Sequence, residues 1–303
     1  MVIRTILDTD IGTDVDDCLA LALILGSPEF ALEGVTCVYG DTELRGRMVR
    51  KLLALRGRDD VPIRLGARPP LLGLREIHWV GHEGKGLLDA EDHVVGFSPE
   101  HAADFIVRTV MDKPDQIHLL AIGPLTNVAL AMAKEPRLAA HLAHLTIMGG
   151  ALRGPDSLGL AVAEHNIVCD PEAAQIVLSS GAAMSLVPLD VTTRCSIRPD
   201  HVARLRAVGD PFHDAVADQV ERYPWFVKKG STFLHDPLAA AIVIEPGLVE
   251  TVPLHVAVET QGRLTSGMTV MRAPAEHLPA TAAVALKVDS ARAEEFIVGR
   301  LVR

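Results

Sequence analysis

The strongest chemical signal in the chain is a run of aspartates close to the N-terminus. Five carboxylates occupy ten positions between a short apolar segment and an apolar helical pattern: Asp8, Asp10, Asp14, Asp16 and Asp17. Because like charges repel one another, this density predicts a tightly bound cation or a chemistry that needs one. All of the donors are carboxylate oxygens, which favours Ca²⁺ or Mg²⁺ over zinc.

Three other interpretations account for part of the acidic run. Aspartate is favoured at helix N-termini, where it caps free N–H groups, but this explains only one or two of the residues. An EF-hand loop needs a glutamate at its twelfth position, where Leu19 stands. A phosphotransferase with Asp8 or Asp10 as nucleophile stays open, although the chain has no phosphate-cradling glycine loop with a lysine.

A carboxylate and an amide stand close together in the middle of the chain. Glu164 and Asn166 are two positions apart, so they share one face of an extended segment. Together they offer a hydrogen-bond acceptor and an amide, as a polyhydroxylated ligand requires. Upstream, Gly149-Gly150 lets the backbone approach a ligand closely.

Two junctions between apolar runs and helical patterns carry further polar groups. In the first, LAIGPLTN, Thr126 or Asn127 is typical of a helix N-cap. In the second, His235 and Asp236 directly precede a helical pattern, and Asp236 taken by itself is also typical of an N-cap. Each junction alone therefore predicts no more than a capped helix.

Strand-like and helical segments alternate along the chain, which predicts an α/β fold with an open, largely parallel central sheet and flanking helices. Several strands are continuous apolar runs, as in strands that are buried on both faces. We expect strands at 2–7, 34–38, 116–122, 144–148, 184–189 and 252–258. We expect helices at 16–25, 42–55, 99–111, 125–133, 171–179 and 213–227.

In open sheets of this kind, ligands bind beyond the carboxyl ends of the strands. The acidic run, Gly149-Gly150 and Asp190 all directly follow expected strands, so we expect them to meet at one crevice. Residues 66–96 show little periodic pattern and are rich in Gly and His, which predicts a loop region over that site. Because no linker or repeat divides the chain, we expect residues 1–303 to form a single domain.

Composition and charge exclude several classes of protein. The 303 residues are 49% hydrophobic and 22% charged, which is typical of a globular protein. A net charge of -10 without a basic run argues against nucleic-acid binding. No apolar stretch is long enough for a membrane span, and residues 2–7 are too short for a signal peptide. The four scattered cysteines are expected to be free thiols in a reducing cytoplasm.

Taken in order, six motifs resemble the inosine–uridine-preferring nucleoside hydrolase family: DTDIGTDVDD, GPLTN, MGG, AEHN, DPEAA and HDPLA. The resemblance runs from Leu7 to about Ala240, and the combination is specific although each motif alone is weak. It implies an open, Rossmann-like α/β fold, a tightly bound Ca²⁺ and a homodimer or homotetramer. It also implies hydrolysis of the N-glycosidic bond of purine or pyrimidine ribonucleosides, for salvage or catabolism.

The resemblance also assigns roles to individual residues of this chain. Asp10 would bind the ion and accept a proton from the attacking water, and His235 would assist the departing base. The implied ligands of the ion are Asp10, Asp17, Asp236 and the backbone carbonyl of Thr126. The implied substrate contacts are Asp16, His82, Met148, Glu164, Asn166 and Asp236.

The acidic loop departs from the family pattern. Ile11 replaces a proline, and two extra residues precede the Asp16-Asp17 pair. Asp14 could therefore take over one of the implied roles. After the second strand, Asp41 replaces an asparagine, which predicts additional negative charge near the ion.

Three further segments differ from the pattern or carry two interpretations. Ser157-Leu158 replaces Gly-Asn, which predicts the loss of one amide contact to the sugar, and His165 replaces an aromatic Phe. The segment YPWF at 223–226 lies where the family has a mobile aromatic segment over the base, and surface helix packing is an equal alternative.

The implied chemistry agrees with the residue types. Breaking the C–N bond builds positive charge on the ribose, which nearby carboxylates stabilise, and negative charge on the base. Asp10 would act as the base, and His235 as a hydrogen-bonding or proton-donating group. A non-catalytic nucleoside or sugar sensor on the same scaffold stays open as an alternative, because fold does not determine function.

Overall fold

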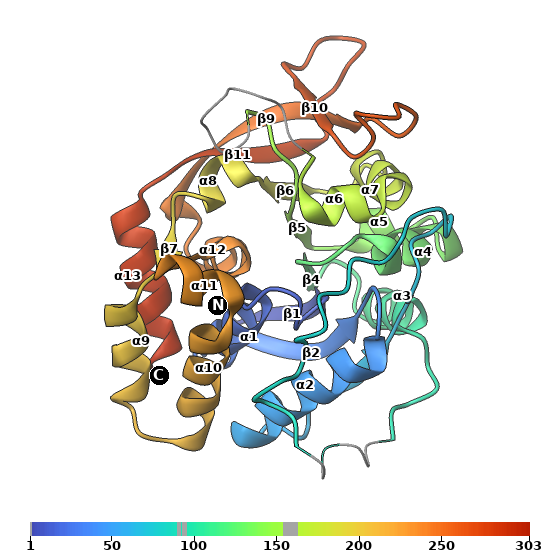
Figure 1. Cartoon of the computed structure of the whole chain (residues 1–303). Helices are drawn as coiled ribbons and strands as arrows, with labels where there is room; N and C mark the ends of the chain where they lie inside the picture. The colour runs from blue at the N-terminus through green and yellow to red at the C-terminus, as the bar shows by residue number, and fades with distance from the viewer. Residues whose placement is uncertain (1, 90–91, 93–95, 154–162) are drawn as a thin grey trace.

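The computed structural model describes residues 2–89, 92, 96–153 and 163–303 (Figure 1). A nine-stranded sheet runs through the molecule in the order β10-β9-β11-β6-β5-β4-β1-β2-β3. Its strands are β1 (Ile3–Thr9), β2 (Phe30–Cys37), β3 (Ile63–Leu65), β4 (Ile117–Ala121), β5 (His144–Met148), β6 (Met184–Val187), β9 (Val249–Val258), β10 (Thr269–Arg272) and β11 (Ala282–Val288). A separate pair joins β7 (Ser196–Ile197) to β8 (Thr232–Phe233).

The parallel part of the sheet confirms the expected fold class. From β3 to β6 the spatial order is 3-2-1-4-5-6, with every neighbouring pair parallel, and β11 joins β6 in parallel. In the described part of this sheet, the antiparallel pairs are β10 with β9 and β9 with β11. In a sheet with this order, the crevice lies where the order reverses, beside β1 and β4.

Helices cover both faces of the sheet (Figure 1). They are α1 (Asp16–Leu25), α2 (Thr42–Leu55), α3 (Ala102–Asp112), α4 (Thr126–Lys134), α5 (Leu138–His141), α6 (His165–Cys169), α7 (Pro171–Leu178), α8 (Leu189–Thr192), α9 (Pro199–Arg206), α10 (Pro211–Arg222), α11 (Pro224–Lys229), α12 (His235–Ile244) and α13 (Ser290–Leu301), with a 3₁₀ turn, η2, at Pro246–Leu248. None of the helices in the described ranges is long and apolar enough to cross a membrane.

Alternate residues of the central strands contribute to two different hydrophobic cores. On β1, Ile6 packs into the core beneath α3, α4 and α7, whereas Leu7 packs into the core beneath α1, α12 and α13. Leu119 and Leu120 of β4 divide in the same way. Burial on both faces explains why these strands are continuous apolar runs in the sequence.

Most of the expected strands and helices are present, but one expected helix is wrong in its length. The helix expected at 213–227 is two helices, α10 and α11, which meet at Tyr223. Pro224 has no N–H to continue the first helix, and it biases the preceding residue toward an extended conformation. Tyr223 has φ −62° and ψ 122°, so the chain turns there.

Candidate active site

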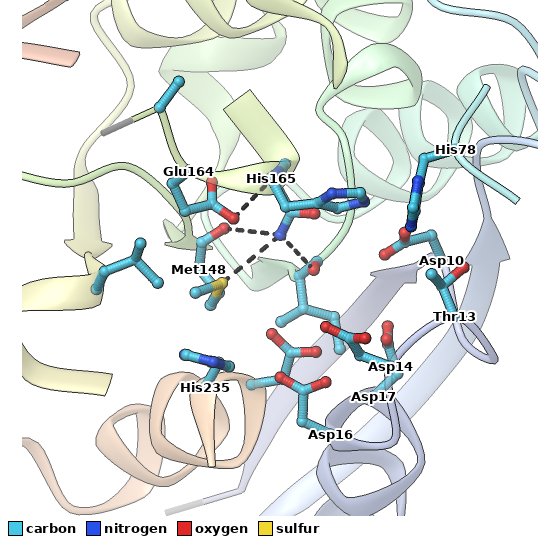
Figure 2. A pocket seen from close by; sticks show the side chains of 15 residues that line it. Asp10, Thr13, Asp14, Asp16, Asp17, His78, Met148, Glu164, His165 and His235 are labelled. Atoms are coloured by element: carbon cyan, nitrogen blue, oxygen red, sulfur yellow. Dashed lines mark hydrogen bonds between the residues drawn. The ribbon is translucent and has the colours of Figure 1, made fainter. Parts of the chain in front are cut away.

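A cleft of about 250 Å³ opens beyond the carboxyl ends of β1, β4 and β5, where the strand order reverses. Figure 2 shows its lining, in which acidic side chains predominate. The lining residues are Asp10, Thr13, Asp14, Asp16, Asp17, His78, Ile122, Met148, Ala163, Glu164, His165, Asn166, Leu189, His235 and Asp236. Segments far apart in the sequence therefore meet here, as expected for the acidic run, whereas Gly149 and Gly150 are not among the lining residues.

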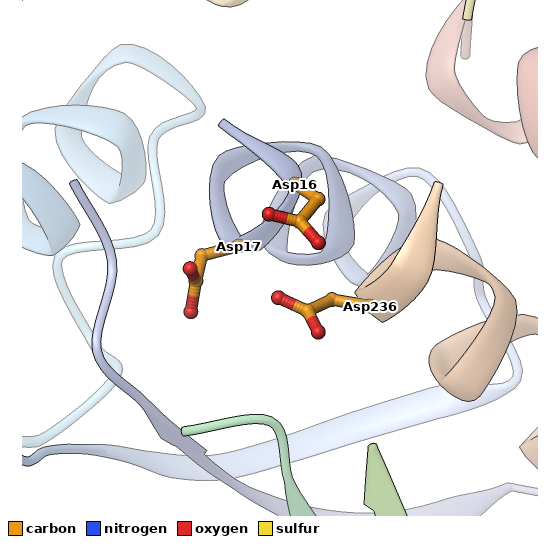
Figure 3. Close-up of side chains that lie close together, drawn as sticks. All are labelled: Asp16, Asp17 and Asp236. Carbon is orange, nitrogen blue, oxygen red and sulfur yellow. The ribbon is translucent and has the colours of Figure 1, made fainter. Parts of the chain in front are cut away.

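Three buried carboxylates form the centre of the acidic group (Figure 3). Asp16 and Asp17 lie in the first turn of α1, and Asp236 lies in the first turn of α12. One oxygen from each carboxylate lies within 4.8 Å of the others. The N-cap interpretation of Asp236 is wrong, because α12 begins at His235 and no side chain caps it.

The electrostatics of this cluster favour the binding of a cation. Burial raises the pKa of Asp16, Asp17 and Asp236 well above the usual value, and the neighbouring carboxylates raise it further. Three ionised carboxylates at this spacing repel one another unless a cation lies between them. An all-oxygen donor set fits a hard divalent ion such as Ca²⁺ or Mg²⁺.

Asp10 follows β1 and lines the same cleft, but it lies outside the group of three closest carboxylates. Burial raises its pKa, and the Arg45 guanidinium opposes that rise. A side-chain carbon at Gly123 would lie 2.8 Å from Asp10 Oδ1, so the turn after β4 needs a glycine there. Asp10 as a ligand of the ion and Asp16 as a sugar contact stay predictions.

Glu164 and Asn166 line the cleft. Figure 2 shows Glu164 beside Met148, the last residue of β5. Glu164 caps α6: one carboxylate oxygen accepts from Asn166 N at 2.8 Å, and the other accepts from Gly150 N at 3.0 Å and Ile167 N at 3.1 Å. The Asn166 amide donates to the Ile122 carbonyl at 2.7 Å and contacts Met148. These bonds hold both side chains in place before any ligand binds.

His235 begins α12 and faces the cleft on the side opposite His78 (Figure 2). Its Nδ1 lies 2.7 Å from the Thr192 hydroxyl, which fixes the orientation of the ring. Burial lowers the pKa of His235 to about 4. At neutral pH the ring is therefore uncharged, and one of its nitrogens can carry an N–H for a ligand.

His82 lies at the rim of a neighbouring cavity of about 450 Å³ and does not line the acidic cleft. Its Nε2 contacts the Thr13 carbonyl at 2.9 Å. Asp14 borders both cavities and accepts a hydrogen bond of 2.6 Å from the Tyr223 hydroxyl. In the aromatic segment 223–226, Tyr223 contacts Asp14 and Phe226 is buried in the core, which agrees with helix packing. A role of this segment over the base stays a prediction.

Thr126 and Asn127 are buried, and neither caps α4, so their interpretation as an N-cap is wrong. The Thr126 hydroxyl donates to Asp170 Oδ2 at 2.6 Å, and the Asn127 amide nitrogen donates to Asp8 Oδ1 at 2.8 Å. Asp170 caps α7, as its sequence Asp-Pro-Glu predicts. The role of the Thr126 carbonyl as a ligand of an ion stays a prediction.

Asp8 is fully buried and does not line the cleft, so the structure does not place it as a phosphate acceptor. Asp41 caps α2, and its Oδ1 lies 3.7 Å from Arg68 Nη2. Asp41 does not line the cleft, so its charge pairs with Arg68 rather than facing the acidic group. Asp190 binds the backbone N–H groups of residues 152 and 153 rather than facing the cleft. The Ser157-Leu158 departure lies outside the described residues.

Sequence reasoning missed several residues of the lining. His78 comes from the loop region 66–96, where the sequence predicts a cover over the site without indicating which residue faces it. Thr13 and Leu189 flank acidic positions and carry no pattern of their own. His165 had a signal, because it interrupts a position that is aromatic in the resembling family, and its ring lies 5.6 Å from that of His78.

Comparisons with known proteins agree with this geometry. Residues 5–295 match the family model of the inosine-uridine preferring nucleoside hydrolases. The chain is 38% identical over 286 residues to the pyrimidine-specific ribonucleoside hydrolase RihA of Enterobacter sp. (strain 638), covering 89% of this chain and 88% of the relative. It also resembles the solved structure of a purine-preferring ribonucleoside hydrolase from Gardnerella vaginalis, with TM-score 0.89 and 30% identity over 99% of this chain and 98% of the other. The solved structure of a plant nucleoside hydrolase, PpNRh1, is similar with TM-score 0.88 and 26% identity, covering 100% of this chain and 99% of the other.

Proposed function

Because the chain belongs to the inosine-uridine preferring nucleoside hydrolase family, we propose that it uses Ca²⁺ to hydrolyse the N-glycosidic bond of ribonucleosides. Family membership itself makes the chain an N-ribohydrolase. The dependence on calcium and the role of each residue are the proposal. The observation that carries it is the buried group of Asp16, Asp17 and Asp236 in a cleft that also contains Asp10 and His235.

Calcium suits the donor set better than a softer metal. The three carboxylates come from the ends of two helices and leave room for further oxygen ligands, as Ca²⁺ requires. We propose Asp10, Asp17, Asp236 and the Thr126 carbonyl as its ligands, and the spacing supports Asp16 as a further neighbour. When bound, the ion supplies Lewis acidity, which makes nearby water easier to deprotonate.

Asp10 is the proposed general base. Its carboxylate lies in the cleft beside the acidic group, where it can accept a proton from the water that attacks the anomeric carbon. As the C–N bond breaks, the electron pair leaves with the base, and positive charge develops on the ribose. Carboxylates around the sugar stabilise that charge.

The proposed contacts of the ribose hydroxyls are Glu164, Asn166 and Asp16. Because backbone and amide hydrogen bonds already fix Glu164 and Asn166, they can orient the sugar with little further loss of freedom. His235 is the proposed partner of the departing base, to which an N–H of the neutral ring would donate. His82 and Met148 are further proposed contacts of the substrate.

The proposal extends to a purine or pyrimidine ribonucleoside as substrate, because the named relatives include both preferences. Salvage or catabolism of nucleosides is the proposed role, in the cytoplasm. We also propose that residues 1–303 act as a single domain, since one sheet spans β1 to β11, and that the chain forms a homodimer or homotetramer.

The test is release of free ribose from inosine, adenosine, guanosine, uridine and cytidine by the purified protein with Ca²⁺. We expect ribose from at least one nucleoside, loss of activity with a chelator and recovery on adding Ca²⁺. Asp10→Ala should lower kcat by about 10²–10⁴-fold, whereas the surface variant Asp60→Ala should match the wild type. Binding of a nucleoside without release of ribose would instead support a sensor.

A further inference from the structure

Arg45 is the only arginine or lysine that is fully buried in the described part of the chain. It lies near the start of α2, and its side chain reaches beneath the acidic loop. Burial of a guanidinium is costly unless charge and hydrogen bonds compensate it. What surrounds this group therefore indicates what it does.

The guanidinium of Arg45 connects two loops at the carboxyl ends of neighbouring strands. Its Nε donates to the Tyr39 carbonyl at 2.6 Å, in the loop after β2. Its Nη1 donates to the Ile11 carbonyl at 2.8 Å, and its Nη2 to the Thr13 hydroxyl at 3.1 Å, both in the acidic loop after β1. Tyr39 has φ 65°, a left-handed conformation in which its carbonyl meets Arg45.

The same group also reaches the cleft and its covering loop. Arg45 Nη2 lies 4.0 Å from Asp10 Oδ2, which makes Arg45 a cation beside the proposed general base, together with His165. The guanidinium carbon lies 5.1 Å from the centre of the Trp79 ring, in the loop that also carries His78. A planar fork with several fixed donors is suited to holding such segments in one arrangement, which a lysine cannot do.

The remaining acidic residues have a different support. Asp16 and Asp17 belong to α1 and Asp236 to α12, so two packed helices hold these three carboxylates beside the proposed ion. Asp10 lies in the loop between β1 and α1, which contains Gly12 at φ 118° and has no regular structure. The position of Asp10 therefore depends on contacts from other parts of the chain, such as the hydrogen bonds of Arg45 to this loop.

We propose that Arg45 is a positioning residue, whose guanidinium holds Asp10 and residues 11–13 in the arrangement that the reaction needs. This inference rests on the proposed function, and it adds a residue that acts through Asp10 rather than on the substrate. Displacement of a reacting group by about 1 Å can cost about 100-fold in rate. Loss of Arg45 should thus lower kcat strongly, change KM little, and weaken the binding of calcium only in part, through the displaced ligand Asp10.

The test compares Arg45→Met and Arg45→Lys with Arg50→Met. Arg50 lies on the same helix, and its guanidinium carbon lies 5.5 Å from the centre of the Phe97 ring, so the control removes a similar contact away from the acidic loop. The measurements are kcat and KM for ribose release, the shift of Tm on adding Ca²⁺, and hydrogen–deuterium exchange of the peptide that contains residues 10–14.

For Arg45→Met we expect kcat to fall about 100-fold, with KM within about threefold. The calcium-induced shift of Tm should become smaller but persist, because Asp10, a proposed ligand of the ion, moves while Asp17 and Asp236 stay in place. Exchange in the 10–14 peptide should become faster in this variant and not in Arg50→Met. Arg45→Lys keeps the charge but not the fork, and it should lie between the wild type and Arg45→Met. If Arg45→Met does not fold, Arg45→Lys carries the test.

A wild-type kcat in folded Arg45→Met or Arg45→Lys, or faster exchange spread evenly over the chain, would overturn the positioning role. A wild type that releases no ribose would contradict the proposed function instead. In that case the exchange of the 10–14 peptide still decides whether Arg45 holds the acidic loop.

Discussion

His235 and Asp10 share one cleft but differ in the charge beside them. Burial favours the uncharged form of both groups, so it raises the pKa of Asp10 and lowers the pKa of His235 to about 4, but the Arg45 guanidinium beside Asp10 opposes the rise. A pair of groups whose environments differ in this way can divide the acid and base roles of one reaction. For His235, the role is then to hydrogen-bond the departing base as it gains negative charge.

This role leads to a prediction about the leaving group. His235→Ala should lower kcat by about 10²–10⁴-fold for inosine but much less for a nitrophenyl riboside, whose leaving group needs no such assistance. Steady-state kinetics on both substrates is the measurement, and His255→Ala on β9 is the control. Equal losses on the two substrates would show that His235 acts in another way.

The turn from β4 into α4 shows how elements, rather than single side chains, shape the cleft. The strand ends at Ala121, and Gly123 then passes so close to Asp10 that a methyl group would lie 2.8 Å from Oδ1 and 2.9 Å from the backbone N. Asn127, in the first turn of α4, reaches back to Asp8 and to the Cys37 carbonyl. The motif GPLTN therefore packs three strand ends together.

Gly123→Ala should displace Asp10 and destabilise the protein by about 1–3 kcal/mol, because the new carbon has no free space. We expect kcat to fall by more than the loss of folded protein explains. Gly299→Ala is the matched control, since a carbon added there on α13 meets nothing within 4 Å. That substitution should be neutral or stabilise the helix by up to about 1 kcal/mol. Wild-type activity in Gly123→Ala would show that the cleft does not need Gly123 to approach Asp10 so closely.

At the scale of the whole molecule, we expect the pH dependence of stability to involve a buried histidine, His118, away from the cleft. His118 on β4 and His144 on β5 lie side by side, with ring centres 5.3 Å apart, and His118 Nε2 contacts the Thr146 hydroxyl at 2.9 Å. Burial lowers the pKa of His118 to about 3, and the neighbouring His144 contributes to this shift.

Between the ordinary histidine pKa of about 6.5 and the folded value of about 3, the unfolded chain binds the proton and the folded chain does not. Stability must therefore fall as the pH is lowered through this window. From pH 7.5 to pH 5, we expect His118 to lower the free energy of unfolding by about 2 kcal/mol. Urea unfolding of the wild type and of His118→Gln at both pH values measures this fall in stability. If the free energy of unfolding falls equally in the two proteins, His118 does not cause it.

The sequence by itself determined the features that depend on local pattern. The ranges 16–25, 42–55 and 144–148 agree with α1, α2 and β5, because hydrophobic periodicity and N-terminal residues act over short distances. The acidic run likewise predicted a cation site, since repulsion among neighbouring carboxylates can be recognised without a fold. By contrast, β11 is rich in alanine, a weak strand former, and was not predicted.

Only the tertiary structure decided which residues meet. Asp236 joins Asp16 and Asp17 because α12 packs against α1, and Arg45 reaches Asp10 because α2 follows the strand next to β1. The sequence equally allowed Asp41 near the ion and Asn127 at a helix cap, but one caps α2 and the other binds Asp8. The physical reason is that such contacts depend on long-range packing of the strands and helices, which no local pattern of residues encodes.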